Sequence, residues 1–202
     1  MERASELIKA VHGSGIRGQT IAMDSWFVAK NLISDIRKLG YHWVGRIKSN
    51  RICYLDGKRL NIKELAATIP DHEWLKMRSL YKNPPKNKKK STQYIAAKPV
   101  YLQTLGNINM VFVKESLEGE VKLFLGSDRF DLSAEDILKI YTERWRIETF
   151  FRDCKQNIDL SGYMGRSIIG FERFLSLAFI AYSFIKYLSL TGFWGLNVKF
   201  FV

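Results

Sequence analysis

Four residues with chemically active side chains lie at helical spacing within the segment YTERWRIETFFRDCK. Arg144, Glu148 and Lys155 follow Tyr141 by three, seven and fourteen residues. At about 100° per residue these offsets fall within an arc of about 60°, so one helix face carries a phenol, a carboxylate and two cations. Arg and Lys can hold phosphate groups, and a carboxylate can hold a magnesium ion. The spacing alone also fits an ordinary surface helix with local Tyr–Arg or Arg–Glu pairs.

Another acid, Asp24, directly follows the short and mostly apolar segment QTIAM at 19–23. This pattern predicts a buried strand that carries Asp24 at its carboxyl end. From Trp26 to Leu39 apolar residues recur at helical spacing, and Gly40 is placed to end that helix. The next segment, YHWVGRIK, predicts a second strand. The chain therefore begins with a strand–helix–strand unit of the parallel kind.

The predicted secondary structure changes after residue 50, where short strand-like segments begin, and again near residue 129, where helical patterns return. We expect a partial core at 1–50, a β-rich insertion at 51–128 with an Asp56-Gly57 turn, and completion of the core at 129–202. Ser133 is the expected N-cap of a long helix that ends near Asn157. The apolar run at 174–185 predicts a buried helix, although a membrane span is the alternative because apolar residues resume after a single lysine.

The composition points to a polyanionic partner. The chain has 202 residues and a formal net charge of +12, with 47% hydrophobic residues. Disordered and acidic classes are therefore excluded, and nucleic acid is the leading partner. A lysine-rich arm includes Lys88, Lys89 and Lys90; it is either a solvated loop or an arm that contacts phosphates. Two cysteines are too few for a disulfide framework, so we expect a reduced, cytoplasmic protein.

The residues around the helical motif resemble a known family. YTERWRIETFFRDCKQ preceded by LSAEDI, together with MDSWFVAKNLI and GYMGRSIIGFERFLSLAFIAYSF, is similar to the DDE transposases of bacterial insertion sequences, in the group with a Tyr-Arg-Glu-Lys signature. The resemblance implies an α/β, RNase H-like fold with a β-rich insertion before the helix of the catalytic Glu. It also implies Mg²⁺ or Mn²⁺ as cofactor and DNA, both transposon ends and target, as partner.

The resemblance assigns roles residue by residue. Asp24 matches the second catalytic Asp and Glu148 the catalytic Glu, and both are expected metal ligands. Tyr141, Arg144 and Lys155 match the positions that engage DNA phosphates near the cut. Phosphodiester cleavage can use two divalent ions, which activate the attacking oxygen and stabilise the leaving oxygen.

One part of the family pattern is missing. The first catalytic Asp of the family lies on a strand well upstream of the second, yet Glu2 and Glu6 are the acids that precede Asp24, and neither follows a strand-like run. We therefore expect a partial RNase H-like fold, from a truncated or split transposase that is inactive alone. Asp128, after the strand-like run VKLFLGS, is a possible substitute, although an acid there more often forms a turn or cap.

Three functions are consistent with these observations. The first is transposase-type strand cleavage and joining, completed by a second copy or by a separately encoded N-terminal portion. The second is a basic DNA-binding remnant without catalysis. The third is a basic protein held at a membrane surface by its apolar C-terminal segment. The motif and the net charge favour the first, with DNA rather than a membrane as partner.

Overall fold

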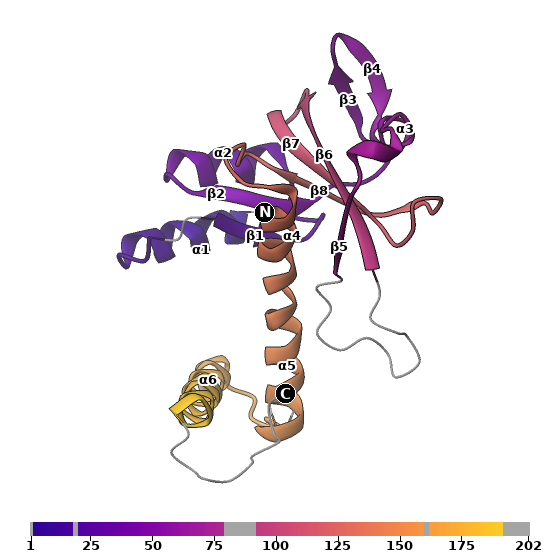
Figure 1. Ribbon diagram of the computed structural model, residues 1–202. Helices are drawn as coiled ribbons and strands as arrows, with labels where there is room; N and C mark the ends of the chain where they lie inside the picture. Colours follow the sequence, from indigo (N-terminus) through magenta and orange to yellow (C-terminus); the bar gives the residue numbers. More distant parts are fainter. Residues whose placement is uncertain (1, 18–19, 79–91, 160–161, 192–202) are drawn as a thin grey trace. The chain divides into compact units, whose positions relative to one another are not determined.

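The computed structural model describes residues 2–17, 20–78, 92–159 and 162–191 (Figure 1). The chain divides into two compact units, Met1–Arg144 and Trp145–Val202. We call them the sheet unit and the helical unit, and describe each by itself.

Over its described residues, the sheet unit is built on one mixed sheet of eight strands. Its order is β1-β2-β8-β7-β6-β3-β4, and β5 pairs with β6. The strands β1 and β2 are parallel, whereas β8 runs antiparallel to β2 and begins an antiparallel succession through β7 and β6. The strand bounds are β1 Thr20–Met23, β2 His42–Arg46, β3 Ile52–Leu55, β4 Lys58–Asn61, β5 Leu75–Arg78, β6 Thr92–Leu102, β7 Gly106–Lys114 and β8 Val121–Ser127.

Helices cover the two faces of this sheet. Trp43 packs in a cluster with apolar side chains of α2 (Lys30–Lys38), whereas its neighbour Val44 packs in a second cluster with α4 (Ala134–Glu143). Because successive strand residues point to opposite faces, α2 and α4 lie on opposite sides of the sheet. The helix α1 (Glu2–Gly13) contacts α2. Layered helices and strands confirm the predicted α/β class.

The predicted strand–helix–strand unit is present. β1 and β2 pair in parallel, and α2 connects them. Gly40 follows the helix with φ of 76°, and its N–H donates to the carbonyl of Arg37, as expected of a C-terminal cap. The helix begins at Lys30 rather than near Trp26, because residues 25–27 form a turn in which the Phe27 N–H donates to the Asp24 carbonyl. Trp26 is consequently 77% exposed, so the prediction from its apolar side chain that it lies in the core is wrong, whereas Trp43 is fully buried as predicted.

The region predicted as β-rich contains six of the eight strands. Asp56 and Gly57 have φ values of 50° and 76° and connect β3 to β4 in a two-residue hairpin, as predicted. β8 pairs directly with β2, so the sheet is continuous from residues 1–50 into residues 51–128. The boundaries at 50 and 128 stay predictions. The short helices α3 (Ile62–Ala67) and η1 (Asp71–Glu73) connect β4 to β5.

Trp74, which follows η1, is buried beneath a cation. It is 6% exposed, and the Lys114 ammonium lies 3.9 Å from the centre of its ring. Its indole N–H donates to the Ile69 carbonyl at 3.3 Å. The ring therefore packs within the insertion. It does not present a face to an unpaired base, although stacking on a base was an alternative consistent with its position in the sequence.

The predicted long helix is present but interrupted at Arg144. Ser133 is the N-cap, and its hydroxyl oxygen accepts the Asp136 N–H at 3.1 Å. α4 ends at Glu143, and α5 (Trp145–Asn157) ends where the sequence predicts. The boundary between the two units falls at this interruption.

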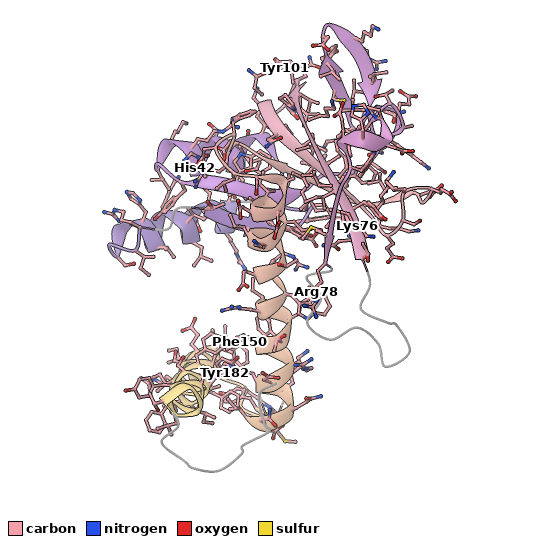
Figure 2. The ribbon with its side chains drawn as sticks, viewed as in Figure 1. His42, Lys76, Arg78, Tyr101, Phe150 and Tyr182 are labelled. Atoms are coloured by element: carbon pink, nitrogen blue, oxygen red, sulfur yellow. The ribbon has the colours of Figure 1, made fainter. Side chains whose placement is uncertain are left out.

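The helical unit consists of α5 and α6 (Ile168–Thr191). Phe150 of α5 packs edge-on against Phe179 and Tyr182 of α6, with ring centres 5.1 and 4.7 Å apart (Figure 2). The segment Ile168–Leu188 is long and apolar enough to cross a membrane, but length and composition alone are weak evidence for a span. Only 6% of its most apolar stretch is buried within the described residues. The expected helix is confirmed, whereas the expected burial is not, because two helices cover little of each other's surface.

Candidate active site

Asp24 lies where the sequence predicts, at the carboxyl end of β1. Its side chain is exposed, and its Oδ1 accepts the N–H of Ser25 at 2.7 Å. The turn at 25–27 follows directly and takes the chain away from the strand before α2 begins. A carboxylate in this position is accessible to a ligand at the end of the sheet.

Tyr141 connects this end of the sheet to the core beneath α4. It is 9% exposed and packs in the cluster that includes Val44 and Leu125. Burial raises the pKa of its phenol, the charge and hydrogen bond of Arg144 oppose that shift, and the charge of Asp24 raises the pKa further. The phenol is therefore neutral at physiological pH, within the electrostatic influence of Asp24.

Arg144 follows the last residue of α4 and lies next to Tyr141. Its guanidinium carbon is 5.6 Å from the centre of the Tyr141 ring, a cation–π arrangement. The sequence pattern predicted one helix face for these two residues and left a local Tyr–Arg pair as the alternative; in the structure they are in contact, with Arg144 just beyond the end of α4. Arg144 therefore places a positive charge beside the Tyr141 phenol, whose pKa the charge of Asp24 also influences.

Arg46 is a member of this site that the sequence motif did not reveal. It is the last residue of β2, is exposed, and lowers the pKa of the Tyr141 phenol through its positive charge. β1 and β2 are adjacent and parallel, so their carboxyl ends, which carry Asp24 and Arg46, lie at the same edge. The same argument applied to the predicted strand YHWVGRIK would have identified Arg46.

The arrangement has the features of a phosphate-binding site beside a carboxylate. Two guanidinium groups, from Arg46 and Arg144, can hold phosphate oxygens through charge-assisted hydrogen bonds. The neutral phenol of Tyr141 can donate one more. Asp24 repels a phosphate by itself, so its place in such a site requires a cation.

Glu148 and Lys155 belong to the helical unit. Both are exposed residues of α5, and their separation by seven residues places them on one face of that helix. Tyr141, Arg144 and Asp24 belong to the sheet unit. The convergence of Glu148 with Asp24 therefore stays a prediction.

The lysines Lys88, Lys89 and Lys90 lie outside the described residues. The strand β5 that leads toward them carries two exposed cations, Lys76 and Arg78 (Figure 2). The role of the lysine-rich arm in binding DNA stays a prediction.

Asp128 has a structural role that accounts for its side chain. Its carboxylate accepts hydrogen bonds from Arg37 Nε at 3.2 Å and from the Trp43 N–H at 3.1 Å, and lies 3.4 Å from His42 Nδ1. These contacts are at the amino end of β2, whereas Asp24 is at the carboxyl end of the adjacent parallel strand. The alternative that Asp128 serves as a catalytic metal ligand is therefore not supported.

The donor chemistry of Asp24 suits a hard divalent ion. Asp24 offers carboxylate oxygens, the ligands that Mg²⁺ and Mn²⁺ prefer. Within the part of the chain that the structure describes, no group of three or more His, Cys, Asp or Glu residues is placed to hold a metal ion. Asp24 alone fits such an ion only as one member of a larger set.

Comparison with known proteins identifies the family. A search of curated proteins found no match to this sequence. A family model described as "Transposase DDE domain" matches residues 1–184, which include the whole sheet unit and most of the helical unit. Transposases of this family act on DNA, normally with divalent metal ions, and their α/β fold is RNase H-like. The match covers most of the chain, so this protein belongs to the DDE transposase family.

Proposed function

We propose that this protein takes part in transposase-type cleavage and joining of DNA strands. The observation that carries the proposal is the meeting of Asp24, Arg46, Tyr141 and Arg144 at one edge of the sheet in a member of this family. The chain would act on transposon ends and target DNA in the cytoplasm.

The cations and the phenol would position the DNA. Arg144 and Arg46 bind phosphate oxygens near the cut, and Arg144 is held in orientation by its contact with the Tyr141 ring. The Tyr141 phenol remains protonated because its pKa is raised, so it can donate a hydrogen bond to a phosphate oxygen. Lys155, exposed on α5, adds a further positive charge.

Asp24 and Glu148 would hold the divalent ion. When Mg²⁺ or Mn²⁺ is bound, it supplies charge neutralisation at the phosphate and activation of the attacking oxygen. The family pattern calls for a third carboxylate, on a strand upstream of Asp24, to complete such a site. We infer that a second copy or a separately encoded segment supplies it, so that the isolated chain does not cleave DNA.

A strand-transfer assay tests this function. The substrate carries the DNA that flanks the gene for this chain, and the reaction contains Mg²⁺ or Mn²⁺. We expect no cleavage by the chain alone, and cleavage when a fragment bearing the missing Asp on a strand is added. Glu148→Gln should abolish that activity, because losing transition-state electrostatics of this kind commonly costs several kcal/mol.

The outcomes separate the candidate functions. Activity of the isolated chain that disappears in Glu148→Gln would contradict the need for a second segment. Duplex binding without cleavage under any of these conditions would favour the non-catalytic DNA-binding role.

The lysine-rich arm is tested by DNA binding as a function of salt concentration. Charge reversal at Lys88, Lys89 and Lys90 should weaken duplex binding and flatten its salt dependence, because fewer counterions are released. Charge reversal at three exposed lysines of α1 and α2, Lys9, Lys30 and Lys38, is the matched control, because it changes the net charge by the same amount. Equal effects at both places would show that the arm contributes only net charge.

A further inference from the structure

A row of exposed and half-buried side chains crosses four strands at the edge of the sheet farthest from β1. Arg59 of β4 pairs with Tyr54 of β3, Tyr54 with Tyr101 of β6, and Tyr101 with Asn107 of β7. Directly opposed residues on neighbouring strands point to the same face. The four side chains therefore line one continuous strip across β4, β3, β6 and β7.

The strip lies on the same face of the sheet as α4. Tyr101 alternates in phase with Ile95 and Ala97 of β6, which pack in the cluster beneath α4. That helix covers the middle of the sheet and leaves this edge uncovered: Tyr101 is 45% exposed. Figure 2 shows Tyr101 at the end of β6, near the β3–β4 hairpin.

The aromatic side chains enclose an open groove. The rings of Tyr54 and Tyr101 have centres 6.1 Å apart, and their planes are inclined by 56°, so the two rings are neighbours that are tilted relative to each other. The groove has a volume of about 510 Å³, and its lining includes Pro99, Asn107 and Phe130. Its surface thus combines flat apolar rings with an amide group.

Phe130 reaches the groove from a loop that is held in place. The neighbouring Arg129 donates from Nε and Nη2 to both carboxylate oxygens of Asp131, at 2.8 and 2.7 Å, and its Nη1 donates to Thr20. Its backbone N–H donates to the Ser127 hydroxyl at 3.1 Å. These bonds fix the loop between β8 and α4, so Phe130 is 53% exposed without being free to fold back.

The charges around the groove select among its possible occupants. Lys58 and Arg59 are exposed on β4, and Arg59 lies on the same face as Tyr54. Asp56, at the hairpin turn, is the acid among the lining residues. A cation, Arg59, on the same face as a set of aromatic rings gives the combination that binds single-stranded nucleic acid: the cation contacts the backbone and the rings stack on bases.

We propose that this groove binds unpaired bases of single-stranded DNA. Tyr54, Tyr101 and Phe130 stack on bases, Arg59 contacts a phosphate, and the Asn107 amide offers a donor and an acceptor to a base edge. The choice of DNA rests on the proposed function, in which cleavage and joining expose unpaired strand ends. A proline-rich peptide also docks on aromatic grooves, but its uncharged backbone does not pair with the Arg59 guanidinium.

The test compares single-stranded and duplex DNA. Binding of a labelled oligothymidylate of about 15 nucleotides and of a blunt duplex is measured by fluorescence anisotropy in EDTA, so the result does not depend on a metal or on cleavage. The double variant Tyr54→Ala/Tyr101→Ala should weaken oligothymidylate binding about fivefold or more, with duplex binding changed less than about twofold. Tyr187→Ala, which removes an exposed tyrosine of α6, is the matched control.

Two further measurements make the result decisive. Tyr54→Phe/Tyr101→Phe keeps the rings and should restore single-strand binding, which separates stacking from loss of fold. A bromouracil-substituted oligonucleotide should photo-crosslink to Tyr101 or Phe130.

Equal losses for single-stranded and duplex DNA would overturn the proposal, as would failure of the Phe variant to restore binding. Tighter binding of a proline-rich peptide that displaces the oligonucleotide would overturn it in favour of a peptide site. Because the assay contains no metal, it can succeed where the strand-transfer assay fails, and the two conclusions are tested separately.

Discussion

Tyr141 shows how one residue serves both the core and the candidate site. Its ring packs under α4 with apolar side chains of β2 and β8, while its hydroxyl is influenced by the charges of Asp24, Arg46 and Arg144. A buried aromatic ring has a fixed position, and Arg144 is oriented against it. The core thereby positions the guanidinium that we propose to bind phosphate.

Replacing Arg144 tests this positioning. Arg144→Ala should weaken duplex binding and reduce the slope of log affinity against log salt by about 1, because one phosphate contact is lost. Arg144→Lys should keep most of the slope but lose affinity, because an ammonium group cannot make the bidentate contact. The salt titration is repeated with Lys38→Ala, on the opposite face of the sheet. A slope that Arg144→Ala leaves unchanged would remove Arg144 from the DNA interface.

Asp131 gives a prediction of pH dependence. Its hydrogen bonds from Arg129 lower the pKa of its carboxyl from 3.8 to about 2. Because the pKa of the Asp131 carboxyl is lower in the folded state than in the unfolded state, its ionised form stabilises the folded state above pH 3.8. This stabilisation is lost as the pH falls toward 2. The stability difference between wild type and Asp131→Asn should therefore shrink over this window in denaturant unfolding. A difference that stays constant down to pH 2 would mean that the Arg129 pair does not hold the loop.

At the scale of elements, Asp128 joins three parts of the sheet unit. It follows β8, accepts a hydrogen bond from the backbone of β2, and pairs with Arg37 of α2. Its side chain is 12% exposed, so its partners depend on it for their hydrogen bonds.

The structural role of Asp128 predicts a loss of stability without loss of metal binding. Asp128→Ala leaves the Trp43 N–H without its acceptor and should cost about 1–3 kcal/mol of unfolding free energy. Mn²⁺ affinity, measured by calorimetry with the complete complex, should match wild type, whereas Asp24→Asn should lower it. Weaker Mn²⁺ binding by a folded Asp128→Ala protein would return Asp128 to the list of ligands.

Local signals in the sequence predicted the elements well, and contacts distant in sequence were harder to predict. The Ser133 cap, the Asp56-Gly57 turn and the strand ending at Asp24 each depend on a few neighbouring residues, and all three are confirmed. Arg46 and the burial of Trp74 depend on which strands pair, and no local pattern encodes that pairing. The candidate site was therefore predicted from its helix and its β1 acid, but without its β2 cation.

At the scale of the whole molecule, the helix interruption at Arg144 separates the expected catalytic carboxylates into two units. Asp24 belongs to the sheet unit and Glu148 to the helical unit. If the two acids share metal ions, as the family assignment implies, the units must come together in the active complex. Exposed apolar residues of α6, which include Leu177, Ile180 and Phe184, form a surface that would be stabilised by packing against another protein surface.

Cysteine cross-linking tests whether Asp24 and Glu148 meet. Both positions are exposed, so Asp24→Cys and Glu148→Cys should be tolerated. The native Cys53 and Cys154 are fully buried, and burial raises the pKa of both thiols, so they should react slowly. With DNA present, a short bifunctional thiol reagent should link the new pair within one chain, or between two chains if a second copy completes the site; gel mobility distinguishes these products. Asp24→Cys paired with Glu172→Cys, on the exposed first part of α6, is the control. Cross-linking of the control pair at the same rate as the Asp24–Glu148 pair would contradict a shared metal site, because two carboxylates that hold the same ions cannot be farther apart than the ions allow.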